Sequence, residues 1–270
     1  MVKNLKCERI VVKAGTSILT PINKNKFSRT RLEKLGNEIW KLVRAQKKVV
    51  LVSSGAIALG MEAFGLMQRP KEMPRLQSCA AVGQGKLMHE YERFFSKKGI
   101  HTAQLLLTRD GLENRTRSLL ARQTLEELLR MKTVPIVNEN DTIATEEIAF
   151  GDNDKLSVYV GALIKADLVI ILSDVDGFYL QDGTRVRQVS SLKELDALAG
   201  HVRDSRKERT VGGMKAKLAA ARVAMNSGIP LLLVSGHEEN ILQKIIAGKD
   251  VGTLFYSSEA IRRDDLIVWS

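Results

Sequence analysis

Short apolar runs rich in β-branched residues alternate along the first part of the chain with longer segments whose apolar residues recur every three or four positions. The short runs predict strands and the longer segments predict helices. The expected order is strand 10–12, helix 31–44, strand 49–52, helix 56–64, strand 102–107, helix 113–131, strand 134–137, a helix after residue 154, and strand 168–172. Such alternation is typical of βαβ units, and it predicts an α/β fold whose mostly parallel sheet is covered by helices.

The last hundred residues predict a hairpin and then a return to the alternating pattern. Asp182-Gly183 is a common type I′ turn and lies between two short runs, 178–180 and 185–189. The remaining expected elements are helices at about 213–227 and 239–247 and strands at 231–234, 254–256 and 266–269. Because no repeat and no Pro/Ser-rich linker interrupts the chain, we expect one domain over residues 1–270.

The composition is that of an ordinary globular protein, with 44% hydrophobic and 27% charged residues. Lys and Arg total 42 against 31 Asp and Glu, and this excess suits polyanionic partners such as nucleotides, although a solvated basic surface gives the same count. No apolar run approaches the roughly 18 residues of a membrane span, and the N-terminus lacks a signal-peptide core. Cys7 and Cys79 stand apart and the histidines show no metal-ligand spacing, which predicts a reduced cytoplasmic protein without a protein-bound metal.

Ligands of open α/β sheets collect beyond the carboxyl ends of the strands, so the residues that follow each apolar run are candidates. Lys13 and Gly15 follow the first strand, where a glycine lets the backbone approach a phosphate and the lysine supplies charge. Ser54 and Gly55 follow the second strand at a helix start, where a hydroxyl and bare amides can hold a carboxylate. A solvated lysine and a plain helix cap are the simple alternatives.

Two polar clusters, residues 138–141 and 151–154, follow the next strand and open the next helix with the sequences NEND and GDND. Helix capping accounts for one Asp or Asn at a helix start, but it does not require carboxylates and amides at two neighbouring sites. We therefore favour a binding site here. Asn and Asp side chains can hold both the amino group and the carboxylates of an amino acid.

The fourth unusual strand ending combines Ser173 and Asp174 with a glycine-rich segment that opens a later helix. That segment consists of Val211, Gly212, Gly213, Met214, Lys215, Ala216 and Lys217. Bare glycine amides before a helix and the charge of Lys217 suit a phosphate, although a Gly-Gly pair is often only a turn. Neither GxxxxGK[ST] nor GxGxxG after the first strand occurs. The charged segment 201–210 fits either a loop beside a ligand or an ordinary solvated loop.

Nine short motifs, taken in order, resemble those of the glutamate 5-kinases of the amino acid kinase family. They are VVKAGTS, SSGAIALG, AAVGQ, QLLLT, VPIVNENDT, GDND, ILSD, VGGMKAK and VGTLF, and they run from about Ile10 to Phe255. The pairing of NEND with GDND is the most specific of them. The resemblance implies the three-layer αβα sandwich of the amino acid and carbamate kinases, with glutamate bound mainly by residues 1–165 and ATP mainly by residues 166–270.

The resemblance also implies an activity: transfer of the γ-phosphoryl group of ATP to the γ-carboxylate of L-glutamate, with Mg²⁺, as the first step of proline biosynthesis. By matching motif positions, the implied roles are glutamate binding by Ser54, Gly55, Asp141 and Asn153, ATP binding by Lys13, Gly15, Ser173, Asp174 and residues 211–217, and catalysis by Lys13, Asp154 and Lys217. A glutamate carboxylate is already ionised at neutral pH, so no general base is required and no placed histidine is expected.

Further expectations follow from the resemblance. The sequence stops at Ser270, soon after the kinase motifs, as in short forms without a C-terminal PUA domain. Proline is expected as a feedback inhibitor and a homodimer or tetramer as the assembly, with neither a membrane nor a nucleic acid as partner. Val211 lies where such enzymes often carry a small hydroxyl residue, and residues 205–210 lack the usual glycines. The resemblance therefore does not define which contacts this segment makes with ATP.

Two other functions compete with this interpretation. A uridylate or acetylglutamate kinase shares the general pattern, but it is disfavoured by NEND followed by GDND. A nucleotide sensor or RNA-associated protein fits the net charge of +11, but base stacking needs exposed aromatic residues, and these make up only 5% of the chain and are scattered.

Overall fold

The structure is a computed structural model that describes residues 7–20, 27–143, 153–200 and 213–257. The strands are β1 (Arg9–Ala14), β2 (Lys48–Ser53), β3 (Thr102–Leu107), β4 (Val134–Glu139), β5 (Leu168–Ser173), β6 (Phe178–Tyr179), β7 (Arg185–Val186), β8 (Gln188–Val189), β9 (Leu231–Ser235) and β10 (Thr253–Phe255). The helices are α1 (Thr16–Leu19), α2 (Arg29–Arg44), α3 (Ala56–Ala63), α4 (Met73–Ser96), α5 (Arg109–Glu113), α6 (Arg115–Arg130), α8 (Asp154–Leu163), α9 (Leu192–Ala199), α10 (Met214–Asn226) and α11 (Ile241–Ile246).

Eight of these strands form one central sheet in the order β3-β4-β2-β1-β5-β9-β10-β8. All neighbours are parallel except β9 and β10, which pair antiparallel. The predicted mostly parallel sheet is therefore confirmed. Among the described helices, none is both long and apolar enough to span a bilayer.

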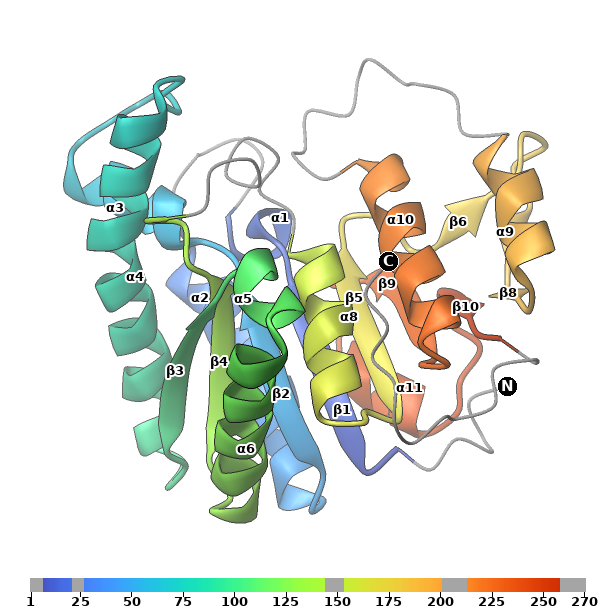
Figure 1. Ribbon diagram of the computed structural model, residues 1–270, viewed down its shortest axis with the longest axis horizontal. Coiled ribbons are helices and arrows are strands. Elements are labelled where there is room, and N and C mark those ends of the chain that lie inside the picture. Colours follow the sequence, from blue (N-terminus) through green and yellow to red (C-terminus); the bar gives the residue numbers. More distant parts are fainter. Residues whose placement is uncertain (1–6, 21–26, 144–152, 201–212, 258–270) are drawn as a thin grey trace.

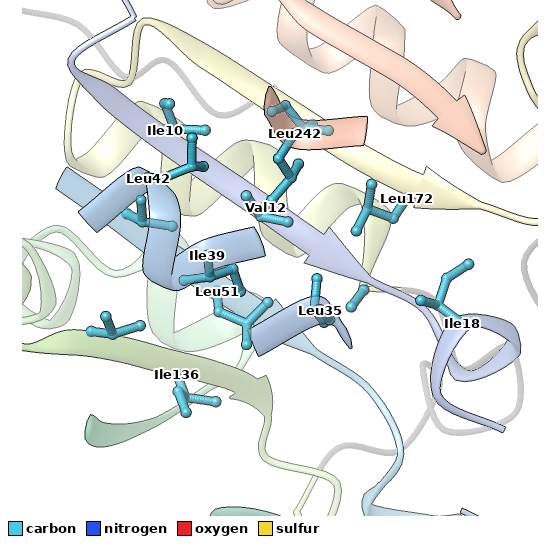
Figure 2. Close-up of a cluster of buried hydrophobic side chains, with 14 of the residues drawn as sticks. Ile10, Val12, Ile18, Leu35, Ile39, Leu42, Leu51, Ile136, Leu172 and Leu242 are labelled. Atoms are coloured by element: carbon cyan, nitrogen blue, oxygen red, sulfur yellow. The ribbon is translucent and has the colours of Figure 1, made fainter. Parts of the chain in front are cut away.

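Side chains that alternate along the strands supply two apolar cores, one on each face of the sheet. Ile10 and Val12 belong to the first core, and Val11 between them belongs to the second. Helices α1, α2, α3, α4 and α11 contribute to the first core, and α5, α6, α8, α9 and α10 contribute to the second (Figure 1). Figure 2 shows the first core, where Ile39 of α2 and Leu242 of α11 lie against β1. The predicted three-layer αβα sandwich is confirmed.

Helices α4 and α9 lie where the sequence pattern predicted none, as do the short helices α1 and α5. Leu87, Tyr91 and Phe95 recur every four positions along the second half of α4, so part of its signal was available, whereas Ala80 and Gly83 lie on the buried face of its first half. Helix α9 begins after Ser191, whose hydroxyl accepts a hydrogen bond from the Glu194 amide, while the Glu194 carboxylate accepts one from Ser190. A serine followed three residues later by glutamate is a known helix-start signal, so α9 was recognisable in the sequence.

Two predicted elements differ in detail. The helix expected over 113–131 is present as α6, which begins at Arg115 because the side chain of Asn114 caps it by accepting from the Arg117 amide; the short helix α5 precedes it. The hairpin β6–β7 is present, but Gln188–Val189 leaves it and pairs with β10 in the central sheet. The type I′ prediction was wrong because Gly183 has a positive φ and Asp182 does not.

Helices α3 and α4 cross at very close range, an approach that two glycines permit. A Cβ built at Gly60 would lie 1.8 Å from the carbonyl oxygen of Cys79, and one built at Gly83 would lie 1.7 Å from that of Ala56. Both contacts are with backbone atoms, which cannot rotate away. The crossing therefore fixes the position of α4 relative to the start of α3.

Replacing Gly60 by alanine should destabilise the protein by about 2–3 kcal/mol, because the helices must separate and the gain in helix propensity, about 1 kcal/mol, is smaller. Urea unfolding would measure this. Gly85→Ala is the matched control on α4, since a Cβ there meets no atom within 4 Å and its φ is not positive. Equal unfolding free energies for the two variants would contradict the close crossing.

Candidate active site

The carboxyl ends of the inner strands place the predicted residues along one edge of the sheet, at the upper side of Figure 1. The strand register sets Ala14 beside Ser53 on one side and beside Leu172 on the other. The segments that follow β1, β2 and β5 therefore leave the sheet side by side. The N-terminus of α8 reaches the same edge, because Asn153 donates a hydrogen bond to the Ser53 carbonyl.

Three charged side chains from three separate elements meet at this edge. The ammonium group of Lys13, on β1, lies 2.5 Å from Oδ1 of Asp154 at the start of α8. The ammonium group of Lys217, on α10, lies 3.5 Å from the other oxygen, Oδ2. One carboxylate thus links two lysines that are 204 residues apart in the sequence.

This cluster of charged side chains is removed from water. Asp154 is fully buried, and the side chains of Lys13 and Lys217 are only 7% and 13% exposed. Burying charges is costly unless they are paired, and here one carboxylate pairs with both ammonium groups. Such a site stabilises an anion that enters between the lysines.

Asn153 occupies the N-cap position of α8, but its side chain does not cap that helix. Its Nδ2 instead donates to the Ser53 carbonyl and the Ser54 hydroxyl, both at 3.1 Å, and to Oδ1 of Asn138 at 2.9 Å. Asn138 in turn donates from Nδ2 to Oε1 of Gln84 on α4. Helix capping, the simple alternative for Asn153, therefore does not explain this residue.

The loop after β2 is held in a specific conformation. The Ser54 amide donates to the Ala14 carbonyl, and the Ser53 hydroxyl is 2.8 Å from that of Tyr91, a buried side chain of α4. Burial raises the pKa of the Tyr91 hydroxyl, while its hydrogen bond to Ser53 acts in the opposite direction. Gly55 has φ of 112°, a conformation that L side chains rarely adopt, so the glycine is required for this turn into α3.

Gly15 has ordinary backbone angles, so its role is spatial. A Cβ at this position would lie 3.2 Å from the ammonium nitrogen of Lys13. The missing side chain therefore leaves room for the Lys13 head group beside the backbone of residue 15.

Ser173 and Asp174 lie at the end of β5, Ser173 buried and Asp174 exposed, with the Ser173 hydroxyl donating to the Asp174 carboxylate. The register pairs Ser173 with Ser235 of β9, and the Gly236 amide donates to the Ser173 carbonyl. Partial burial lowers the pKa of the adjacent His237, and Arg31 adds to this shift while Asp174 opposes it. Small polar residues thus follow both β5 and β9.

The glycine-rich segment is described from Gly213 onward, and Val211, Gly212 and the charged segment 201–210 lie outside the described residues. Gly213 is the N-cap of α10, and Met214, Lys215, Ala216 and Lys217 form its first turn. The expected helix start is therefore present. Lys215 is exposed, whereas Lys217 points to Asp154.

Asp141 follows β4 and is half-buried. Its charge acts on the guanidinium of Arg69, from the segment between α3 and α4: partial removal from water lowers the pKa of Arg69, and the Asp141 carboxylate opposes that shift. Asp141 thus belongs to the part of the edge that lies toward α3 and α4.

A shallow groove on the surface lies away from this edge. It is lined by Lys48 at the start of β2 and by side chains of α6 between Leu119 and Arg130. The start of a strand lies at the opposite end from its carboxyl terminus, so this groove is at the other end of the sheet. None of the predicted site residues lines it. The active-site candidate remains the edge with the lysine pair.

Comparison with known proteins identifies the family. Residues 8–235 match the amino acid kinase family. The chain is 44% identical to the glutamate 5-kinase of Carboxydothermus hydrogenoformans, covering 95% of this chain and 69% of that protein. It is 43% identical to the glutamate 5-kinase of Symbiobacterium thermophilum, covering 92% of this chain and 96% of that protein. The chain belongs to the glutamate 5-kinases of the amino acid kinase family. It is therefore a kinase.

Solved structures place this glutamate 5-kinase family member in the same fold as more distant kinases. Carbamate kinase from Giardia lamblia, bound to AMP-PNP, superposes with a TM-score of 0.67 at 19% identity, covering 96% of this chain and all of that one. UMP kinase from Bacillus anthracis gives a TM-score of 0.61 at 18% identity, covering 94% and 97%. These similarities establish the fold and confirm the expected carbamate kinase-like architecture.

Several residues that lie at this edge are not among the site residues predicted from the sequence. Asn138 and Gln84 lie in the NEND and AAVGQ motifs, but no role was assigned to either. Ser53 precedes the selected Ser54, and Ser235 and Gly236 follow an apolar run as the selected endings do. The signal for Ser235 was available, whereas the hydrogen bonds of Asn138 and Gln84 depend on how α4 packs.

Proposed function

We propose that this chain transfers the γ-phosphoryl group of ATP to the γ-carboxylate of L-glutamate, giving L-glutamyl 5-phosphate in the first step of proline biosynthesis. The observation that carries the proposal is the buried cluster in which Lys13 and Lys217 share Asp154. Two anions must approach each other in this reaction. Two buried ammonium groups held at one site lower the cost of that approach.

The chemistry asks for positioning more than for proton transfer. The acceptor carboxylate, with a reference pKa of about 4.3, is already a nucleophile at neutral pH. One of its oxygens attacks the γ-phosphorus in line with the bond to the leaving β-phosphate oxygen, and that bond breaks. In our proposal Lys13 and Lys217 stabilise the charge on the transferred group from two sides, and Asp154 orients both ammonium groups.

The two substrates would occupy the two halves of the edge. Glutamate would be held by Ser54, Gly55, Asp141 and Asn153, toward α3 and α8. ATP would be held by Lys13, Gly15, Ser173 and Asp174 and by residues 211–217 at the start of α10, where free helix amides favour phosphate. This division corresponds to a mainly glutamate-binding side over residues 1–165 and a mainly ATP-binding side over residues 166–270 of one domain, with Lys13 and Gly15 as the exceptions.

Mg²⁺ fits this arrangement as an ion carried by the ATP phosphates. The described residues contain no group of three His, Cys, Asp or Glu side chains that could hold a metal alone, and both oxygens of Asp154 already face lysines. The ion would add positive charge at the phosphates. The residues of this chain would then position the nucleotide and the acceptor.

The proposal is tested by ADP release from ATP with glutamate, aspartate, N-acetylglutamate or UMP as acceptor, with hydroxylamine present to trap an acyl phosphate. Turnover with glutamate alone, accompanied by the hydroxamate, is the expected result. ADP release that does not depend on glutamate, or a preference for UMP or N-acetylglutamate, would refute it.

We further propose that proline inhibits the reaction by competing at the glutamate side, since both ligands carry an ammonium and an α-carboxylate group. Proline should raise the apparent KM for glutamate and leave kcat unchanged, and D-proline serves as the control. Inhibition that persists at saturating glutamate would place the proline site elsewhere. A cytoplasmic homo-oligomer is part of the same proposal, and gel filtration with light scattering would test the assembly.

A further inference from the structure

Gln84 is a buried side chain with one hydrogen-bonding group left over. The residue is only 8% exposed, and its Oε1 accepts a hydrogen bond of 2.9 Å from Asn138. Its Nε2, which carries two N–H donors, has no hydrogen-bond partner within the described ranges of the chain. Burying an unsatisfied amide donor is costly, so such a group in a folded protein calls for a physical reason.

The orientation of the Gln84 amide is set by its neighbours. Oδ1 of Asn138 accepts from both Nδ2 of Asn153 and the Glu139 amide, so Nδ2 of Asn138 faces Gln84 as a donor. A donor requires an acceptor opposite it, and Oε1 of Gln84 must therefore occupy that position. Exchanging the two ends of the Gln84 amide would bring two N–H groups together. The free group is thus a donor.

Gln84 lies beside the part of the edge that would hold the acceptor substrate. The neighbouring Gly83 lies against the backbone of Ala56, which places this turn of α4 at the start of α3, next to Ser54 and Gly55. Hydrogen bonds run from Asn153 to Asn138 and on to Gln84. Asp154 and its two lysines lie next to Asn153 at one end of this hydrogen-bonded series, and Gln84 lies at the other end.

We propose that Gln84 is a substrate-binding residue whose Nε2 donates to the α-carboxylate of the amino acid acceptor. The inference rests on the proposed function, since the γ-carboxylate must lie between Lys13 and Lys217 to react. The α-carbon then points away from the lysines. Of the two groups on that carbon, only the carboxylate accepts hydrogen bonds, while the ammonium group requires an acceptor such as Asp141. A donor to a carboxylate at this end selects for an acceptor with a free α-carboxylate.

The decisive experiment compares L-glutamate with its α-carboxamide, L-isoglutamine, as acceptors for the unaltered enzyme and for Gln84→Glu. The glutamate side chain keeps an oxygen for Asn138 and replaces the donor by a second oxygen. We expect kcat/KM for L-glutamate to fall about 10–100-fold, the usual effect of losing a hydrogen bond to a charged group. For L-isoglutamine it should change by less than about threefold, because the carboxamide can donate to the new carboxylate. The KM for ATP should not change.

Gln123→Glu on α6 is the matched control, since it makes the same change of charge on an exposed residue outside the proposed site. Gln84→Met provides a second variant that removes the donor without adding charge, and it should also reduce the preference for L-glutamate. If the ratio of kcat/KM for the two acceptors is the same in folded Gln84→Glu and in the unaltered enzyme, the inference is wrong. If the unaltered enzyme does not use L-glutamate, the proposed function fails instead.

Discussion

Asp154→Asn should lower kcat at least about 100-fold and should also lower the free energy of unfolding by about 3–5 kcal/mol. The carboxylate is fully buried and is the shared counter-ion of Lys13 and Lys217. An amide of the same shape leaves two ammonium groups close together in an apolar setting with no negative charge between them. Both the fold and the position of the lysines should therefore suffer.

Kinetics with saturating ATP and glutamate, together with urea unfolding, would measure the two effects of Asp154→Asn. Asp110→Asn is the matched control, because this carboxylate is exposed in the first turn of α5. A variant with more than a tenth of the original kcat, or with a free energy of unfolding within about 1 kcal/mol of the original, would show that Asp154 does not hold the lysine pair.

The sequence predicted the edge of the sheet well because strand ends can be recognised locally. An apolar β-branched run that stops at Lys13, Ser54 or Ser173 identifies a strand and its carboxyl end in one pattern. Parallel strands then bring these ends together without further information. The meeting of Lys13 with Lys217 was expected only from the resemblance to a family, since nothing in the local pattern relates residues 204 positions apart.

The sequence pattern could not predict features that depend on tertiary contacts. The buried face of the first half of α4 consists largely of small residues, because α3 crosses it at backbone contact, and this half shows little apolar periodicity; Leu87, Tyr91 and Phe95 supply that periodicity only in the second half. Since α4 was not predicted, neither the Gln84–Asn138 hydrogen bond nor the Tyr91–Ser53 contact could be foreseen. Asn153 was among the candidates from the sequence, yet only the structure shows that its side chain turns away from its own helix.

Lys217→Ala should lower kcat about 100- to 1000-fold while the KM for glutamate stays within about threefold. The ammonium group of Lys217 lies at the start of α10, where our proposal places the phosphates, and negative charge on the transferred group increases in the transition state. Unlike Asp154→Asn, this change leaves Asp154 paired with Lys13 at 2.5 Å, so the free energy of unfolding should fall much less.

Lys193→Ala on the exposed face of α9 is the control for loss of one charge. Lys217→Arg separates charge from shape, because it keeps the charge and a donor but places them farther along a planar group, and partial recovery of kcat is expected. An unchanged kcat in Lys217→Ala, or a rise in the KM for glutamate that accounts for the whole loss, would remove Lys217 from the catalytic group. The same pair of measurements distinguishes a lysine that stabilises the transition state from one that only binds the substrates.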